Sequence, residues 1–170
     1  MDAAIWGFIG TIVGAVVGAS ASILTTSING RNASKLQFKA EKYKRDERFR
    51  EFQRENLLKL QNTLSNSMRL LGRAHLEDLN NFKAANKWRS QLLSEELDEE
   101  IRVSFRDLSI LTERVSNDDL RKDLNSMKEL MTSYILTQTK EEAEIQIQKS
   151  ADDFTITMTK LGHDLRTLYN

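Results

Sequence analysis

A long uncharged apolar run near the N-terminus limits what this chain can fold into. No Asp, Glu, Lys or Arg occurs between Asp2 and Arg31. As a helix, residues 5–24 would span about 30 Å, the thickness of the hydrocarbon core of a bilayer. On insertion scales, their large apolar side chains favour the bilayer by about 3 to 5 kcal/mol. The run predicts a transmembrane helix over residues 5–28, preceded by a short external N-terminus, residues 1–4.

Small residues recur at every fourth position of this run and form one row along the predicted helix. In lipid, helices associate through close backbone approach and dispersion contacts, so small residues mark contact faces. The spacing predicts a glycine zipper through which the span self-associates into a homo-oligomer. A plainer interpretation stays open, because glycine is frequent in membrane helices generally. The row consists of Gly10, Gly14, Gly18 and Ser22.

Two further interpretations of the run depend on its polar and small residues. Several copies of the span could line a pore, with hydroxyl groups mainly in its C-terminal half. A secretory signal peptide is suggested by Ala19-Ser20-Ala21, which is similar to a cleavage site. Such peptides begin with basic residues, whereas this chain begins Met-Asp-Ala-Ala. We therefore expect an uncleaved anchor.

Charge is distributed unevenly along the chain. Residues 31–60 hold ten Lys and Arg against five Asp and Glu, a net charge of +5. Residues 91–120 hold three Arg against nine Asp and Glu, a net charge of −6. Because basic residues beside a span stay in the cytoplasm, we expect a single-pass protein of the cell membrane, with the N-terminus outside and the bulk of the chain cytoplasmic. Arg31 and Lys35 would lie at the membrane surface, within reach of lipid headgroups. The basic segment could also contact the acidic one, within a chain or between copies.

The chain contains no proline and no cysteine, which favours long helices and excludes disulfide bonds. Residues 29–56 predict a basic, charged helical stem. From residue 57 onward, apolar residues recur at helical spacing in four segments, and four such helices predict a four-helix-bundle-like cytoplasmic part over residues 57–170. The fold class is therefore all-α, with coiled-coil-like packing. The sequence leaves open whether the first helix continues through Asn29-Gly30 and Gly72, since glycine either ends a helix or is tolerated within it.

The helix boundaries and core positions of this part follow from local patterns. Ser94 is a predicted N-cap, Ser116 to Asp119 and Thr139 to Glu142 fit capping boxes, and Trp88 is expected to close one end of the core. The last segment has the most regular repeat. Its predicted core stripe is Ala143, Ile147, Ala151, Phe154, Met158, Leu161, Leu165 and Leu168.

We find no candidate catalytic, cofactor-binding or metal-binding residues. A di-iron bundle needs a Glu three positions before each ligand His, but Gly72 and Lys160 occupy the positions before His75 and His163. The segment from His75 to Asp78 is interpreted as surface, and the acids at 95–100 as a solvated helix start. We expect a protein that is not an enzyme and has no cofactor. Acidic residues dilute the basic stem, so nucleic acid is not an expected partner.

The N-terminal architecture resembles that of a broad group of small bacterial single-pass membrane proteins with a cytoplasmic helical tail. An acidic start, a glycine-spaced span ending near Thr25-Thr26, and Arg31-Asn32 before a charged helix carry the resemblance. It covers roughly residues 1–50 and implies no functional residues. Stator-stalk b subunits of ATP synthases share the outline but have an unbroken alanine-rich stalk. Phage inner-membrane spanins place their helical part outside.

Three functions are compatible with these patterns. The first is a membrane-anchored helical protein that self-associates through its span and offers a cytoplasmic bundle to an unidentified protein partner, with the lipid bilayer as its other partner. The second is an oligomeric membrane-disrupting or pore-forming effector of the toxin or phage-defence type. The third is a structural subunit of a larger membrane-associated or phage assembly.

Overall fold

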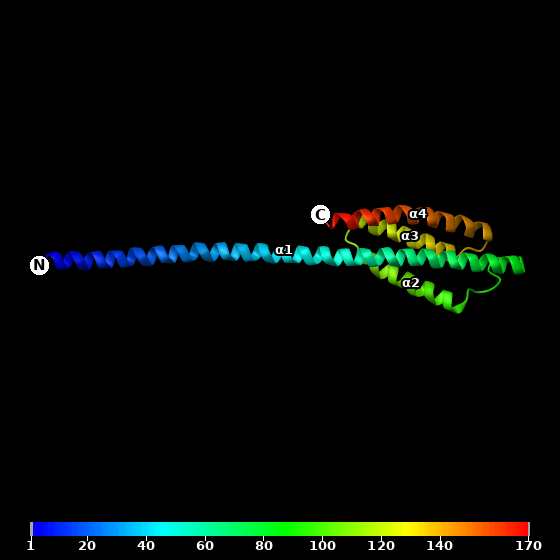
Figure 1. Cartoon of the computed structure of the whole chain (residues 1–170), viewed down its shortest axis with the longest axis horizontal. Coiled ribbons are helices and arrows are strands. Elements are labelled where there is room, and N and C mark those ends of the chain that lie inside the picture. The colour runs from blue at the N-terminus through cyan, green and yellow to red at the C-terminus, as the bar shows by residue number, and fades with distance from the viewer. Residues whose placement is uncertain (1, 170) are drawn as a thin grey trace. The chain divides into compact units, whose positions relative to one another are not determined.

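The computed structural model describes residues 2–169, and its regular elements in that range are all helices (Figure 1). Met1, at the start of the predicted external N-terminus, and Asn170 lie outside the described residues. The prediction of an all-α chain is confirmed. The chain divides into two compact units, residues 1–48 and residues 49–170. The helices are α1 (Asp2–Ala85), α2 (Glu95–Glu113), α3 (Asp118–Ile135) and α4 (Lys140–Thr167).

Helix α1 is uninterrupted through both positions that the sequence left open. Gly30 and Gly72 both have helical backbone, and neither has a positive φ. Each glycine costs a helix about 1 kcal/mol relative to alanine. Strong helix formers flank Gly72 and compensate for that cost, whereas residues 25–29, which precede Gly30, are weaker helix formers.

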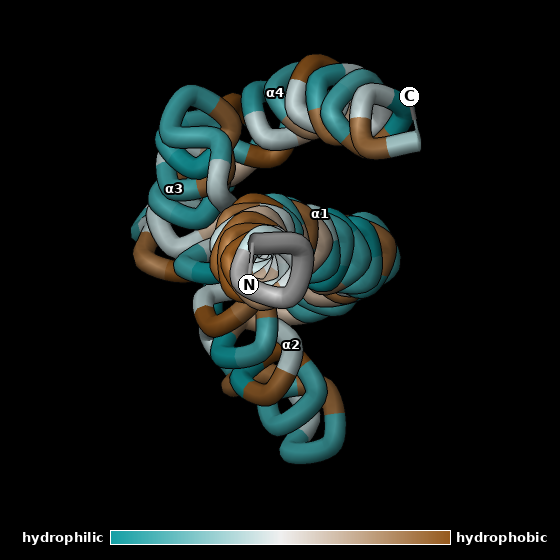
Figure 2. Tube along the Cα trace, turned by 90° about the vertical axis from the view of Figure 1, so that its left-hand side faces the viewer, coloured by the Kyte–Doolittle hydropathy of each residue, from teal (hydrophilic) through white to brown (hydrophobic). Residues whose placement is uncertain are grey.

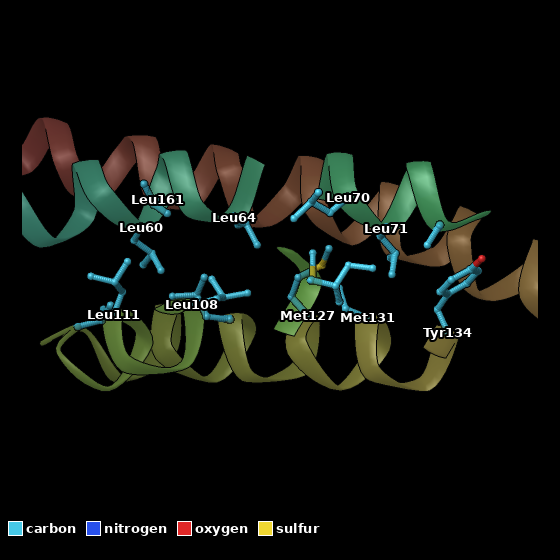
Figure 3. Packing of buried hydrophobic residues seen from close by; sticks show 14 of the residues in the cluster. Leu60, Leu64, Leu70, Leu71, Leu108, Leu111, Met127, Met131, Tyr134 and Leu161 are labelled. Carbon is cyan, nitrogen blue, oxygen red and sulfur yellow. The ribbon is translucent and has the colours of Figure 1, made fainter. Parts of the chain in front are cut away.

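The second unit is built around a continuous hydrophobic core contributed by its four helical segments. Figure 3 shows side chains of α1, α2, α3 and α4 pointing toward one another. The apolar residues at helical spacing in α2 and α3 are buried, except for Phe105 and Ile135, which are half-buried. Trp88 joins the core as predicted. The most enclosed large side chains are Leu60, Leu64, Leu70, Leu71, Leu97, Leu108, Leu120, Leu124, Met127, Met131, Tyr134 and Leu161.

Within this unit, α2 lies on one side of α1, and α3 and α4 lie on another (Figures 1 and 2). Buried amides of α1 hold the turn between α2 and α3. The Gln53 side chain donates to the carbonyl oxygen of Arg114 at 2.9 Å and accepts from the amide of Ser116 at 3.0 Å. Asn56 donates to the carbonyl oxygen of Leu111 at 3.0 Å. These bonds satisfy the carbonyl group of Arg114 and give that of Leu111 a second donor beside the backbone amide of Arg114.

The N-caps of α2 and α4 lie at the predicted residues, and that of α3 lies one residue after Ser116, the start of the predicted capping box. Thr139 caps α4 as predicted, accepting from the amide of Glu142 at 3.2 Å. At α3 the capping side chain is that of Asn117, which accepts from the amides of Asp119 and Leu120. Ser94 is the N-cap residue of α2 but makes no capping hydrogen bond. Its hydroxyl instead donates to a carboxylate oxygen of Glu77 at 3.1 Å.

Helix α4 is rotated relative to its predicted core stripe. Of the eight predicted positions, only Ala143 and Leu161 are buried, and the other six are half-buried. The most enclosed line includes Ser150 and Thr157 instead. Periodicity identifies the apolar face of a helix, but the neighbouring helices decide how far that face is turned inward. Part of the apolar stripe of α4 therefore lies at the edge of the unit.

Candidate functional site

The first candidate site is the row of small residues near the start of α1. Gly10, Gly14, Gly18 and Ser22 lie on exposed helix surface. A methyl group added at any of the three glycines would meet no atom within 4 Å beyond its chain neighbours and the adjacent backbone of its own helix. In a continuous helix, a four-residue repeat keeps them on one inclined face. The row is thus open to another helix, and its role in self-association stays a prediction.

The apolar segment that contains this row has no protein cover. Among the described residues, one helix is long and apolar enough to cross a membrane, and no residue of its most apolar window is buried within the chain. Trp6 and Phe8 expose 72% and 68% of their surfaces. Length and apolar composition are properties that core helices of soluble proteins also have. This segment differs from such helices because its side chains are not enclosed.

Hydroxyl groups in this segment bond to the backbone of their own helix. The Thr11 hydroxyl donates to the carbonyl oxygen of Gly7 at 2.9 Å, and the Thr25 hydroxyl donates to that of Ala21 at 2.8 Å. Such bonds to the residue four positions earlier satisfy the hydroxyl donor without water. These two threonines can therefore face an apolar environment at little cost.

The basic residues that follow are exposed along the helix. Arg31 and Lys35, which the sequence places at a membrane surface, have exposed side chains. In the second unit, the ion pair between α1 and α2 joins Arg73 to Glu100 at 2.6 Å, outside the predicted stem. The hypothesis of a basic stem bound to the acidic helix therefore gains no support from this pair.

A second candidate site is a buried polar cluster that sequence reasoning missed. The carboxylate of Asp78 is only 1% exposed and accepts a hydrogen bond from the Tyr134 hydroxyl at 3.1 Å. The same hydroxyl lies 3.3 Å from Nδ1 of His75. Arg89 approaches the Asp78 carboxylate at 3.4 Å. The interpretation of His75 to Asp78 as a surface segment is therefore wrong for Asp78, and His75 is half-buried.

The burial of Asp78 can be traced to helix geometry. Positions 57, 60, 64, 67, 71, 74 and 78 of α1 are all buried, and their alternating three- and four-residue steps place Asp78 on the core face. This spacing was visible in the sequence. Its neighbours His75 and Glu77 concealed the signal, because three ionisable residues in four positions are typical of a solvated surface.

Arg89 connects this cluster to the end of α3. The connection between α1 and α2 turns at Asn86 and Arg89, whose φ angles are 48° and 49°. The Arg89 guanidinium donates to the carbonyl oxygen of Tyr134 at 3.0 Å and to those of Ile135 and Thr137. A cation at the C-terminus of a helix interacts favourably with its exposed carbonyl groups. Arg89 therefore caps α3.

The pKa values in the cluster shift as burial requires. Burial lowers the pKa of His75, although the carboxylates of Glu144 and Asp78 oppose that shift. Burial and the adjacent Asp78 carboxylate raise the pKa of Tyr134 well above its ordinary value. At neutral pH, His75 is consequently neutral and Tyr134 remains a hydrogen-bond donor. This state matches the observed bonding.

A cleft of about 420 Å³ opens beside the cluster. Its only strongly buried carboxylate, that of Asp78, already binds Tyr134 and Arg89. Within residues 2–169, no group of three or more His, Cys, Asp or Glu side chains is placed to hold a metal ion. The hydrogen bonds of the Asp78 cluster join α1, α3 and the connection that contains Arg89, and this stabilising role accounts for the buried polar groups. The cleft is lined by Asp78, Arg89, Gln91, Leu92, Leu93, Glu95, Asp98 and Ile135.

Comparisons with known proteins do not add to this description. No protein-family model, curated protein or solved structure matches the chain.

Proposed function

We propose that this chain is a non-enzymatic, single-pass membrane protein whose span self-associates and whose helical part serves protein–protein interaction in the cytoplasm. The observation that carries the proposal is the uncovered apolar segment of α1, no part of whose most apolar window is buried within the chain. Transfer of this segment into lipid removes its apolar side chains from water, which is favourable by several kcal/mol on insertion scales.

Self-association through the glycine row is supported by the open surface around Gly10, Gly14 and Gly18. A second span could approach these positions closely, and close approach provides the dispersion contacts that hold helices together in lipid. The internal bonding of Thr11 and Thr25 favours packed helices over a water-filled pore, because these hydroxyls do not require water.

The proposal includes an orientation in the membrane and a four-helix arrangement of the second unit. The exposed Arg31 and Lys35 suit the cytoplasmic surface of the membrane, and in the proposed orientation the N-terminus lies outside. The second unit is proposed to be a four-helix bundle in which α1 supplies one of the four helices. Its common core and short connections support that architecture.

Size measurement of the full chain in mild detergent tests self-association. We expect an oligomer whose mass falls to that of a monomer with Gly14→Ile, because a branched side chain would hold the backbones apart. Val17→Ile, an enlargement at a bulky position of the same segment, is the matched control and should leave the mass unchanged. Equal masses for Gly14→Ile and the unmodified chain would refute the role of the row. A freely water-soluble full chain would refute the membrane anchor.

Labelling in intact cells tests the orientation. The chain has no cysteine, so Arg106→Cys introduces one thiol on the exposed surface of α2. A membrane-impermeant thiol reagent should label this variant only after lysis. Labelling of intact cells would contradict a cytoplasmic helical part.

A further inference from the structure

The cleft beside the Asp78 cluster carries groups that the cluster does not use. Its volume of about 420 Å³ lies within the range of sites that enclose a ligand. Leu93 and Ile135 line it with apolar surface, and Glu95 and Asp98 line it from the start of α2. Within residues 2–169, neither Glu95 nor Asp98 takes part in an ion pair. Their carboxylates are therefore available to a ligand.

Asp78 also lines the cleft, although this residue is only 1% exposed. The Tyr134 hydroxyl and the Arg89 guanidinium both bind its Oδ2 atom. In the part of the chain that the structure describes, no hydrogen bond reaches the other carboxylate oxygen, Oδ1. A buried acceptor without a donor is costly, so this oxygen favours a ligand that supplies an N–H group.

The charges that line the cleft favour a cation. Asp78, Glu95 and Asp98 carry three negative charges and Arg89 carries one positive charge, which gives a net charge of −2. The guanidinium of Arg89 is already bound to Asp78 and to carbonyl groups at the end of α3. Glu95 and Asp98 are three positions apart and share one face of α2. A single guanidinium, with five N–H donors, can bridge two such carboxylates.

An exposed apolar side chain lies at the edge of the cleft. Leu92 lines the cleft and exposes 94% of its surface, more than any other large apolar side chain among the described residues. A small molecule enclosed in the cleft would leave most of Leu92 in water. A protein segment that extends beyond the cleft would cover it and remove that apolar surface from water.

The walls of the cleft are held in place by hydrogen bonds. Arg89 donates to the carbonyl oxygen of Tyr134 at 3.0 Å and so holds the connection between α1 and α2 against the end of α3. Glu77 accepts from the amide of Ser94 at 2.6 Å and holds the start of α2. A site whose walls are already ordered loses less conformational freedom when it binds a ligand.

We propose that this cleft binds a segment of another protein in which an arginine lies beside a leucine or another apolar residue. The guanidinium binds between Glu95 and Asp98, on the side of the cleft that leads to Asp78, and the apolar neighbour covers Leu92. The inference rests on the proposed role of the second unit in protein–protein interaction, and it specifies the chemistry of the partner. Opposite charges across the contact select an arginine-bearing segment over neutral or acidic ones.

Binding of short labelled peptides to the full chain in mild detergent tests this chemistry. The probe is the peptide Ser-Leu-Arg-Leu-Ser with a fluorescent group at its N-terminus, and binding is followed by fluorescence anisotropy against empty micelles. We expect a dissociation constant of about 1 mM or below. Citrulline in place of the arginine keeps its shape and removes its charge, and should weaken binding about tenfold. Equal binding of the two peptides, or binding of neither, would overturn the proposal.

Matched substitutions on the protein locate the site. Glu95→Gln and Asp98→Asn should each weaken binding of the arginine peptide about tenfold, and Leu92→Ser about fivefold. The matched control is Glu96→Gln, because Glu96 belongs to the same first turn of α2 but does not line the cleft. All four side chains are exposed, so the urea midpoints should not change. Equal losses for Glu96→Gln and Asp98→Asn would overturn the cleft as the site.

A small cation tests whether the ligand must be a protein segment. Methylguanidine carries the cationic group without the apolar neighbour that covers Leu92. It should compete with the labelled probe at least about tenfold more weakly than the unlabelled peptide does. Equal competition would assign the cleft to a small organic cation and overturn the protein partner.

Photo-cross-linking in cells separates failure of the cleft from failure of the proposed function. The photoreactive residue p-benzoylphenylalanine replaces either Gln91, which lines the cleft, or Ile110, an exposed residue of α2 away from it. At position 91 we expect linkage to an arginine-containing segment of another protein, reduced about tenfold by Asp98→Asn.

The two positions give different outcomes for the two proposals. Linkage to another protein at Ile110 alone would overturn the cleft and leave protein–protein interaction standing. Absence of linkage at both positions would overturn both proposals. Linkage at Gln91 to a second copy of this chain, or to a segment without arginine, would overturn the proposed chemistry of the partner.

Discussion

Replacement of Asp78 by alanine is expected to lower the free energy of unfolding of the full chain by about 3 to 5 kcal/mol. The carboxylate is buried and accepts a bond from the Tyr134 hydroxyl, with Arg89 at 3.4 Å. Alanine leaves the buried Tyr134 hydroxyl without its acceptor and removes the contact with Arg89, whose side chain is 24% exposed. Tyr134→Phe removes one charge-assisted hydrogen bond with little change in volume and should cost about 1.5 to 3 kcal/mol.

Urea unfolding followed by tryptophan fluorescence measures this effect. The chain contains two tryptophans, and Trp88 lies in the core with its ring centre 6.2 Å from those of His75 and Phe82. In a Trp6→Phe background, purified in mild detergent, Trp88 alone reports the unfolding of the second unit. With a urea dependence of about 2 kcal/mol per molar, Asp78→Ala should lower the midpoint by about 1.5 to 2.5 M.

The matched control is Asp107→Ala, which removes a carboxylate whose side chain is 48% exposed. Its effect should remain below about 0.5 kcal/mol, because exposed ion pairs contribute little. The double variant Asp78→Ala/Tyr134→Phe should cost less than the sum of the two single changes, by about 1 kcal/mol or more. A loss of unfolding free energy below about 1 kcal/mol for Asp78→Ala would refute the stabilising role of the cluster. Strict additivity of the Asp78→Ala and Tyr134→Phe effects would also refute it.

Two further perturbations test other buried groups. Burial lowers the pKa of His75 below its ordinary value of 6.5, so the unfolded chain takes up a proton that the folded chain resists. The free energy of unfolding should therefore fall as the pH decreases below about 6.5. His75→Gln should reduce that dependence in urea midpoints measured at several pH values, and an unchanged dependence would contradict this role. Ser67 and Ser104 form a buried hydroxyl pair at 2.7 Å. Ser104→Ala should cost about 1 to 2 kcal/mol, and adding Ser67→Ala should cost little more because both partners are then removed; full additivity would argue against the bond.

Sequence periodicity predicted the helical class and most core positions, because a repeat of three and four residues depends only on helix geometry. It could not fix the rotation of α4, where Ser150 and Thr157 face inward while Ile147 and Phe154 are half-buried. The rotation of a helix about its axis depends on which helices lie on either side of it. The sequence of that helix alone does not specify its neighbours. The same limit concealed the pairing of Asp78 with Tyr134, which are separated by 56 residues.

Glycine was ambiguous for a different reason. Asn29-Gly30 fits a helix end, but the cost of one glycine within a helix is only about 1 kcal/mol. That cost is small for a helix of 84 residues, and α1 continues through Gly30. For the glycine row, periodicity identified the face, and the structure adds that this face is uncovered by its own chain. The contact proposed for that face would involve another molecule, which one sequence does not describe.

The connection between α1 and α2 joins three helices through hydrogen bonds. Glu77 of α1 holds the amide of Ser94 at 2.6 Å, while Arg89 holds the carbonyl groups at the end of α3. The end of one helix, the start of the next and the end of a third are thereby fastened within one short stretch of chain. Backbone amides in these three places should exchange their hydrogens together, in a single opening event, and fraying at one of them should release all three.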